Sequence, residues 1–368
     1  MKEEFLQRIK QWIPDEYDAF LASFDQPLKQ GLLLNTRKMT PELFFKQTTI
    51  PEVPSVFSKN GYLISDSLGL HPDHIAGCFY LQEPSASAPV SLMDIREEDV
   101  ILDLCAAPGG KSAQIAAQLK HGFLLSNEIN RSRAQTLLSN MERLGFSNVA
   151  VSNDSPQHIA QHYPSVFDKV LVDAPCSGEG MMHKHPQAVE QWSLDLIRQC
   201  QQRQLEILGY AIECLKPNGT LVYSTCTYAK EENEEVISII LERYPMMKLD
   251  PVDVPFGREG GIPGTRRIFP MDGGEGQFMA RLIKTDGSSR SLKEKESVPV
   301  SQTVRTFLKD QLNEPPLFFD RQRDKIYCRR QPFYDFSALH LLRQGICIGQ
   351  EKKNRIEPAH SFYMNADW

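Results

Sequence analysis

Two cysteines stand at the ends of short apolar runs and carry the most distinctive chemistry in the chain. Cys176 lies in the segment DAPCSG, just after the run Phe167–Val172, and Cys226 lies in STCTY, just after Thr220–Ser224. A cysteine beside a strand is usually a small core residue, and this is our interpretation of Cys105, Cys200 and Cys214. Two cysteines that each follow an apolar run instead indicate a reactive pair at one edge of a sheet.

A thiolate in such a place can attack an electron-poor ring carbon. Addition of sulfur to carbon 6 of cytosine makes carbon 5 an enamine-like centre that can attack a sulfonium methyl group; a base then removes the carbon 5 proton and the thiolate is expelled. Free cysteine has a pKa of about 8.5, so only a small fraction is ionised near neutrality. Asp173 could hydrogen-bond the ring edge as charge develops. The base must be single-stranded or flipped out of a duplex. Spacing alone leaves open which cysteine attacks.

The segment Asp103–Ser112, DLCAAPGGKS, is a third chemical feature. A strand that runs through small residues into a helix N-terminus forms a cradle that a cofactor can approach closely. The segment matches neither GxGxxG nor GxxxxGK[ST], which argues against a dinucleotide oxidoreductase and a nucleoside triphosphatase. The alternative interpretation is a plain tight turn between a strand and a helix.

Two acidic residues follow the next two predicted strands. Glu128 lies about 20 residues beyond the glycine turn, a position that suits a ribose hydroxyl pair without distinguishing nicotinamide cofactors from S-adenosylmethionine. It could equally be a surface acid. Asp154 could accept a hydrogen bond from an adenine amino group, or cap the helix that follows it.

The elements that must position these residues form one repeating pattern between Asp99 and Lys284. Short apolar runs alternate with longer helical patterns, which predicts an α/β fold with a parallel, Rossmann-like sheet covered by helices on both faces. Ligands of such sheets bind beyond the carboxyl ends of the strands, where the residues above lie. The predicted strands are Val100–Cys105, Gly122–Asn127, Val149–Val151, Phe167–Val172, Thr220–Ser224 and Met279–Ile283; the predicted helices are Lys111–Lys120, Arg131–Leu144, Ser155–His162, Pro186–Cys214 and Glu231–Tyr244.

The rest of the chain divides into smaller units around a catalytic domain at residues 91–285. Residues 1–90 form a small N-terminal α/β domain, in which Pro14 ends a first helix and Thr40 caps a later one. Residues 286–301 are rich in Ser, Lys and Glu and predict a linker. Residues 302–368 form a small C-terminal accessory domain.

Composition narrows the class of protein. With 41% hydrophobic and 24% charged residues the chain is typical of a soluble globular protein, and no apolar run approaches the roughly 20 residues that span a bilayer. The eight cysteines form no CxxC pair, which argues against a disulfide framework and a metal site, and the N-terminus lacks the features of a signal peptide. We therefore expect a cytoplasmic protein without metal or membrane contact, and a monomer, since nothing indicates an obligate dimer.

Net charge is the one bulk property that argues against a nucleic-acid partner. The chain carries a formal charge of −6 at pH 7. Residues 286–368, however, hold 14 Lys+Arg against 11 Asp+Glu. A local basic face can still bind RNA.

In order and spacing, these segments resemble the Nop/Sun-type RNA 5-methylcytosine methyltransferases over nearly the whole chain. The matching segments are DLCAAPGGK, NEINRSRAQTLLSNMERLG, DAPCSGEG and LKPNGTLVYSTCTYAKEENEEV, with LLLNTRKMTPELF and GCFYLQEPSASAP upstream. The resemblance implies a class I methyltransferase sheet that uses S-adenosyl-L-methionine, with RNA-binding domains at both ends of the chain. It implies that Cys226 is the nucleophile and that Cys176 acts in product release, while Asp173 stays the predicted hydrogen-bond partner of the ring. The cofactor-binding residues that it implies are Cys105, Ala106, Ala107, Pro108, Gly109, Gly110, Lys111, Glu128, Arg133, Asp154 and Asp173.

The segments GGIPGTRRIFPMDGGEGQFMARLIK and LLRQGICIGQEKKNRIEPAH resemble a branch of that family that acts on RNA of the small ribosomal subunit. This implies 16S rRNA, or the small subunit, as the partner; tRNA and 23S rRNA are the alternative substrates. Where the family commonly has Arg-Arg/Lys-x-Pro-Asp, this chain has His183-Lys-His-Pro-Gln187, a predicted loop in which Lys184 could touch a phosphate. Relatives often continue with a further RNA-binding module beyond the position of Trp368.

Two other classes of function fit less well. A protein or small-molecule methyltransferase transfers the methyl group directly and has no need for paired strand-end cysteines. A non-catalytic ribosome-assembly factor that keeps the fold would have no use for both cysteines and a full cofactor loop.

Overall fold

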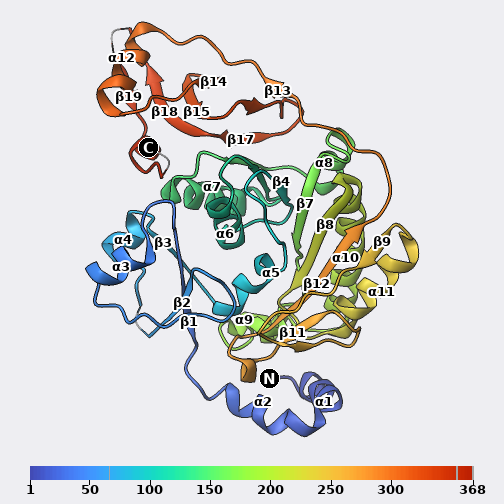
Figure 1. Cartoon of the computed structure of the whole chain (residues 1–368). Helices are drawn as coiled ribbons and strands as arrows, with labels where there is room; N and C mark the ends of the chain where they lie inside the picture. Colours follow the sequence, from blue (N-terminus) through green and yellow to red (C-terminus); the bar gives the residue numbers. More distant parts are fainter. Residues whose placement is uncertain (66, 354, 367–368) are drawn as a thin grey trace.

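The computed structural model describes residues 1–65, 67–353 and 355–366, and its centre is a mixed sheet flanked by helices (Figure 1). The strands of this sheet are β4 (Val100–Asp103), β5 (Phe123–Asn127), β6 (Val149–Ser152), β7 (Phe167–Asp173), β8 (Leu215–Thr225), β9 (Met247–Leu249), β10 (Arg258–Glu259), β11 (Arg266–Ile268), β12 (Gln277–Lys284) and β17 (Leu341–Gln344). Over the described residues their order is β10-β11-β12-β8-β7-β4-β5-β6-β17, with β9 paired to β12.

The predicted parallel strands lie together in the middle of the sheet. The strands β6, β5, β4, β7 and β8 are parallel neighbours, and antiparallel strands extend both edges. The chain starts at β4, places β5 and β6 on one side and then returns to place β7 and β8 on the other. A ligand cleft is expected beyond the carboxyl ends of β4 and β7, because the strand order reverses there.

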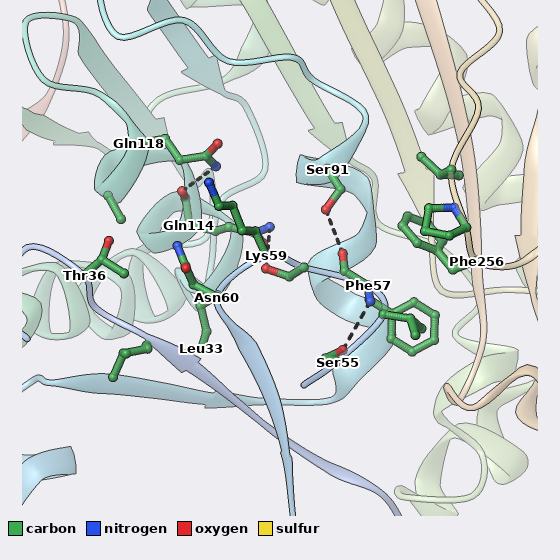
Figure 2. Close-up of a pocket in the computed structure, with 16 residues that line it drawn as sticks. Leu33, Thr36, Ser55, Phe57, Lys59, Asn60, Ser91, Gln114, Gln118 and Phe256 are labelled. Atoms are coloured by element: carbon green, nitrogen blue, oxygen red, sulfur yellow. Dashed lines mark hydrogen bonds between the residues drawn. The ribbon is translucent and has the colours of Figure 1, made fainter. Parts of the chain in front are cut away.

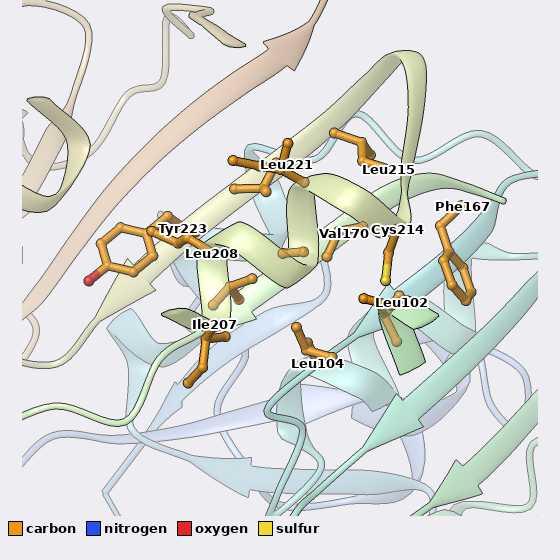
Figure 3. Packing of buried hydrophobic residues seen from close by; sticks show 14 of the residues in the cluster. Leu102, Leu104, Phe167, Val170, Ile207, Leu208, Cys214, Leu215, Leu221 and Tyr223 are labelled. Carbon is orange, nitrogen blue, oxygen red and sulfur yellow. The ribbon is translucent and has the colours of Figure 1, made fainter. Parts of the chain in front are cut away.

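The helices of the catalytic domain lie on both faces of the sheet, with α8, α10 and α11 packed together on one face and α6 and α7 on the other (Figure 1). They are α6 (Gly110–Gln118), α7 (Arg131–Leu144), α8 (Pro156–His162), α9 (Pro186–Gln191), α10 (Leu194–Cys214) and α11 (Glu234–Arg243), with 3-10 turns η3 (Glu179–Met181) and η4 (Lys230–Glu232). The face that carries α10 holds a large apolar core in which Leu102, Val170 and Leu221 meet Leu208 and Cys214 (Figure 3). Cys200 and Cys214 are buried core residues, as predicted.

The prediction of one helix over 186–214 is wrong near its N-terminal end. The chain breaks between α9 and α10, where Ser193 caps the new helix by accepting from the Leu196 N–H at 3.1 Å. The break leaves Trp192 with only 1% of its surface exposed. Helix α11 likewise begins at Glu234 rather than 231, because η4 occupies the preceding residues.

The first ninety residues divide into two parts. The elements are α1 (Glu3–Trp12), η1 (Pro14–Glu16), α2 (Tyr17–Ser23), β1 (Gln30–Leu34), α3 (Pro41–Gln47), β2 (Gly61–Ile64), α4 (Pro72–Ile75), β3 (Phe79–Gln82), η2 (Pro84–Ser87) and α5 (Ala88–Ser91). The strands form an antiparallel sheet in the order β2-β1-β3, and Thr40 caps α3 as predicted. Helices α1 and α2 lie apart from that sheet, because Phe5 packs on Trp192 and Phe20 on Tyr228 of the catalytic domain.

The C-terminal residues are joined to the central sheet. Their elements besides β17 are β13 (Glu294–Lys295), α12 (Gln302–Gln311), β14 (Phe318–Gln322), β15 (Lys325–Arg329), β16 (Phe333–Tyr334), β18 (Ile346–Glu351), β19 (Ile356–Pro358) and α13 (His360–Tyr363). A second sheet has the order β14-β15-β18-β19, while β17 pairs antiparallel with β6. Even the predicted linker contributes a strand, since β13 pairs with β16. No helix of the described residues is long and apolar enough to cross a membrane.

Candidate active site

A cleft of about 380 Å³ opens at the carboxyl ends of β4, β7 and β8. The end of β3 and the segment before β12 close its other sides, so the N-terminal domain and the catalytic domain both line it. Its lining residues are Tyr80, Leu81, Gln82, Glu83, Ala86, Asp103, Cys105, Ala106, Ala107, Pro108, Gly110, Lys111, Arg133, Asp173, Met181, Lys184, Cys226, Glu275, Gly276 and Gln277. Its position is the one expected from the reversal in strand order.

The two strand-end cysteines meet at this cleft. The Sγ atoms of Cys176 and Cys226 lie 3.3 Å apart, and Cys226 lines the cleft. The hydrogen bond to Cys226 and burial together raise the pKa of the Cys176 thiol. Cys176 therefore holds its proton more strongly than a free thiol, and either sulfur can be the donor in the hydrogen bond between them.

A buried carboxylate ties the loops of the two cysteines together. Glu179, with no exposed surface, accepts hydrogen bonds from Trp192 Nε1 at 2.7 Å, Thr227 Oγ1 at 3.0 Å and the Tyr228 N–H at 3.0 Å. The hydroxyl groups of Ser177 and Thr227 form a hydrogen bond, with their oxygen atoms 2.8 Å apart. Glu179 belongs to the DAPCSGEG segment, but nothing in its spacing indicated that it holds the loop after Cys226.

A second buried carboxylate, Glu232, supports the loop after Cys176. Its Oε2 accepts from the Ser177 N–H at 3.0 Å and from Gln204 Nε2 at 2.8 Å, while its Oε1 has no hydrogen-bond partner within the described residues. Burial raises its pKa from 4.5 to about 7 despite these donors. Between these two values the folded protein holds a proton that the unfolded chain releases. The stability from this group is thus complete below pH 4.5 and is lost as the pH rises through about 7.

We predict that Glu232→Gln gains stability relative to the wild type as the pH rises. The amide is neutral at every pH, so the buried charge is never formed. From pH 5 to pH 8 the free energy of unfolding of the variant, relative to the wild type, should increase by about 2 kcal/mol, since one pKa unit corresponds to ~1.4 kcal/mol. Urea unfolding at both pH values measures this, with the exposed Glu206→Gln as control. A difference that does not change with pH contradicts the prediction.

Asp173 is held between two donors at the end of β7. Lys111 Nζ lies 2.7 Å from its Oδ2, and Ser224 Oγ donates to its Oδ1 at 2.7 Å. Burial favours the neutral amine of Lys111, but the charge of the Asp173 carboxylate and its hydrogen bond to Lys111 outweigh this effect and raise the pKa of Lys111. Three predicted residues, Lys111, Asp173 and Cys226, therefore lie together in the cleft with an ammonium group among them.

The loop from Cys105 to Lys111 forms one side of the cleft. Gly109, at φ +113°, occupies a conformation that favours glycine, and a Cβ on Gly110 would lie 2.4 Å from Gln82 Oε1. Asp103, the first residue of the predicted cradle, is the last residue of β4 and also lines the cleft. Burial raises its pKa to about 7, and its Oδ1 has no hydrogen-bond partner in the described part of the chain.

These residues fit S-adenosylmethionine, which carries a positive sulfonium and a positive ammonium group. Asp103 and Asp173 supply carboxylates to the cleft, and the unpartnered Oδ1 of Asp103 can accept a hydrogen bond from an ammonium. The loop would lie against the cofactor, since its small residues permit close approach.

Of the remaining predicted cofactor residues, Arg133 lines the cleft, whereas Glu128 and Asp154 do not. Arg133 donates to the Ala107 carbonyl at 2.8 Å, and Glu128 lies beside Arg133, with Oε2 3.5 Å from Nη1. Asp154 accepts from the His340 N–H and contacts His158 Nδ1, both at 2.9 Å. Glu128, Asp154, Gly109 and Cys176 are absent from the cleft lining as described.

The cleft continues into a smaller cavity of about 260 Å³. The two share Leu81, Gln82, Glu83, Lys184 and Glu275, and the smaller one adds Leu28–Gly31. Lys29 and Lys184 are exposed there, whereas His183 turns to Glu275, with Nδ1 3.0 Å from Oε2. Among the described residues no group of three or more His, Cys, Asp or Glu side chains could hold a metal ion.

Family models match three successive parts of the chain. The model described as 16S rRNA methyltransferase RsmB/F matches residues 90–283. The N-terminal domain of 16S rRNA methyltransferase RsmF matches residues 1–84, and the RsmF rRNA methyltransferase first C-terminal domain matches residues 306–365.

Curated relatives carry the name ribosomal RNA small subunit methyltransferase F. The Erwinia tasmaniensis protein is 36% identical over 303 residues, which cover 76% of this chain and 63% of the relative. The protein of Escherichia coli O127:H6 is 36% identical over 309 residues, covering 77% and 63%. The chain thus spans less than two thirds of the length of these relatives.

Solved structures share the fold. A methyltransferase homolog protein from Pyrococcus horikoshii superposes with a TM-score of 0.67 at 29% identity, covering 77% of this chain and 95% of its own. NSun6 from Pyrococcus horikoshii, solved with SFG, gives a TM-score of 0.70 at 21% identity and covers 78% of this chain and 99% of its own. The Rossmann-like fold and the resemblance found from the motifs are confirmed, and the chain belongs to the 16S rRNA methyltransferase RsmB/F family.

Proposed function

We propose that this chain transfers a methyl group from S-adenosylmethionine to carbon 5 of a cytosine in 16S rRNA. The observation that carries the proposal is the pair of Cys176 and Cys226, 3.3 Å apart, at a cleft that also contains Asp173 and the β4 loop. Direct methyl transfer needs no such pair. Membership of the RsmB/F family favours 16S rRNA over tRNA and 23S rRNA.

The residues of the cleft have distinct parts in the proposed reaction. Cys226 attacks carbon 6 of the cytosine through its sulfur, while Asp173, held by Lys111 and Ser224, hydrogen-bonds the ring edge and stabilises the charge that develops there. S-adenosylmethionine, when bound, supplies an electrophilic methyl group. Carbon 5 would take that methyl group as the bond from the methyl to the sulfonium sulfur breaks, which would leave S-adenosylhomocysteine. Carbon 5 would then lose its proton to a base, and the thiolate of Cys226 would leave carbon 6.

Cys176 acts in this last step as a hydrogen-bond donor. Its thiol keeps its proton, because burial and the hydrogen bond to Cys226 raise its pKa. The S–H group points the proton at the sulfur that must leave as a thiolate, and so stabilises the leaving group. This gives a physical reason for a role in product release.

We predict that Glu128→Ala weakens S-adenosylmethionine binding by about 10- to 100-fold, the loss expected when a charged hydrogen-bond acceptor worth ~1.5–3 kcal/mol is removed. Glu128 is the carboxylate at the end of β5, where the ribose of an adenosyl cofactor is held in such sheets. Isothermal titration calorimetry with the cofactor measures the effect, and the exposed Glu206→Ala serves as control. Wild-type protein that binds no cofactor would remove the cofactor assignment altogether.

Bisulfite sequencing of rRNA and tRNA tests the whole proposal. RNA is taken from cells with the gene, without it, and with the gene restored as Cys226→Ala. The expected result is at least one 16S rRNA cytosine that is protected only when the wild-type gene is present. Protection confined to tRNA or 23S rRNA would show that one of these RNAs, and not 16S rRNA, is the substrate. Equal protection in all three samples would contradict methyltransferase activity and favour a non-catalytic role in ribosome assembly.

A further inference from the structure

Two adjoining cavities lie at the end of α6 that points away from the catalytic cleft. One has a volume of about 590 Å³ and lies among β1, the loop before β2, α6 and residues 254–256 (Figure 2). The other, of about 620 Å³, continues toward the C-terminal residues. They share Thr36, Ala117 and Gln118, and together form what we call the basic groove.

The basic groove has no acidic side chain among its lining residues, all of which belong to the described part of the chain. Its Lys and Arg residues come from all three parts of the molecule: Arg37 and Lys59 from the N-terminal domain, Lys120 from the catalytic domain, and Arg329 and Arg330 from the C-terminal residues. The chain as a whole carries a charge of −6, and the catalytic cleft contains four carboxylates. The charged lining residues of this groove are all Lys or Arg, which is a local reversal of the net charge of this protein.

Two of the five cations fix the walls of the groove. Arg37 Nη1 donates to the Leu119 carbonyl at 2.9 Å, which satisfies the C-terminal end of α6. Arg329 is buried, with its guanidinium 4.5 Å from the centre of the Phe123 ring. These two side chains hold the three parts of the molecule in place around the groove.

The other three cations can reach a ligand. Lys59 is exposed and forms no ion pair within the described residues; Figure 2 shows it with Asn60 beside Gln114 and Gln118 of α6. Lys120 pairs with Glu97 and Arg330 with Glu314, carboxylates that lie outside the groove. Both pairs are solvent-exposed, and such pairs contribute little stability. A phosphate can therefore replace either carboxylate.

We propose that the basic groove binds the phosphate backbone of the substrate RNA at a distance from the target base. This rests on the proposed function and adds a second RNA contact to the catalytic cleft. Gly110 lines the cleft and Gln118 lines the groove, so α6 separates them by eight residues, about 12 Å along the helix. One RNA molecule can occupy both. Uncharged polar side chains lie between the cations, namely Asn60, Gln118 and Gln331. They can hydrogen-bond phosphate and sugar oxygens, which are the same in every RNA sequence.

The test compares two triple variants with the same change in charge. Lys59→Glu, Lys120→Glu and Arg330→Glu together reverse the groove, and Lys46→Glu, Lys309→Glu and Lys353→Glu, all exposed elsewhere, are the matched control. Each is titrated with full-length 16S rRNA at several salt concentrations, and with a short single-stranded fragment around the methylated cytosine. Cofactor binding and the unfolding midpoint are measured for both, and the single variant Lys59→Glu is made in case the triple variant unfolds.

The groove variant is expected to lose affinity for 16S rRNA by about 10- to 100-fold. Its plot of log affinity against log salt concentration should also be less steep by roughly two to three, because each lost phosphate contact lowers that slope by ~0.7–0.9. The control should lose much less, and the short fragment should be methylated equally well by both. Three results would each contradict RNA binding in the basic groove: an equal loss of affinity in the control variant, an equal loss of affinity for the short fragment, or no loss of affinity for 16S rRNA. If wild-type protein methylates 16S rRNA in those cases, the proposed function stands without it; if wild-type protein neither binds nor methylates RNA, both fall.

Discussion

Cys226→Ala is expected to abolish methyl transfer while leaving cofactor binding and folding intact. Cys226 lines the cleft, and in the proposed reaction its sulfur activates carbon 5, a carbon that is otherwise too poor a nucleophile. Loss of the nucleophile should reduce the rate by several orders of magnitude. The change should cost little stability, because the side chain is only partly buried and its sulfur shares one weak hydrogen bond with Cys176.

RNA that contains 5-fluorocytidine gives the direct measurement. Fluorine replaces the proton that must leave carbon 5, so the wild-type enzyme should remain bound covalently and migrate with the RNA on a denaturing gel. Cys226→Ala should give no such band, and the buried Cys200→Ala serves as a matched cysteine control. A covalent band that persists in Cys226→Ala, and disappears in Cys176→Ala, would assign the attack to the other thiol.

Cys176→Ala is expected to have the opposite effect on the covalent intermediate. With ordinary RNA this variant should accumulate protein–RNA adduct, because the sulfur of Cys226 loses the S–H donor 3.3 Å away that stabilises it as it leaves. Attack and methyl transfer should still occur, so the trapped RNA should already carry the methyl group. Turnover should fall far more than the rate of adduct formation.

The double variant separates the two roles. Cys176→Ala combined with Cys226→Ala should form no adduct, because the sulfur that forms the covalent bond to the RNA is absent. Cys176→Ser is informative as well, because a hydroxyl group keeps a donor at nearly the same place and should restore part of the turnover. Clean, rapid turnover by Cys176→Ala would exclude a part in release.

The order of the central strands and the residues at their ends could be predicted from the sequence. Apolar runs alternating with helical patterns are local signals, and the strands β4 to β8 follow them to within a few residues, apart from the N-terminal extension of β8. Because the carboxyl ends of parallel strands meet at one edge, Lys111, Asp173 and Cys226 could be assigned to one site before any distance was known. Segments as distinctive as DLCAAPGGK and DAPCSGEG also determined the family.

The tertiary structure alone decided how these residues are held. The contact between Cys176 and Cys226 joins positions fifty residues apart, and it depends on Glu179 and Glu232, whose burial no local pattern reveals. The break before α10 was missed because a helical period continues across Trp192, while the gain from burying that ring beside Glu179 is a long-range effect. The pairing of β17 is long-range as well: the sequence predicted a separate domain for these residues, but β17 hydrogen-bonds to β6 of the central sheet.

The basic groove shows this division most clearly. Its cations are scattered from Arg37 to Arg330 in an acidic chain, and composition argued against a nucleic-acid partner. Charge in sequence is a sum over residues, whereas the potential in a cavity depends on which few side chains face it. The sequence by itself therefore determined the fold class and the family and predicted two cysteines at one edge of the sheet, whereas the packing of three parts around α6 decided which cations line one groove.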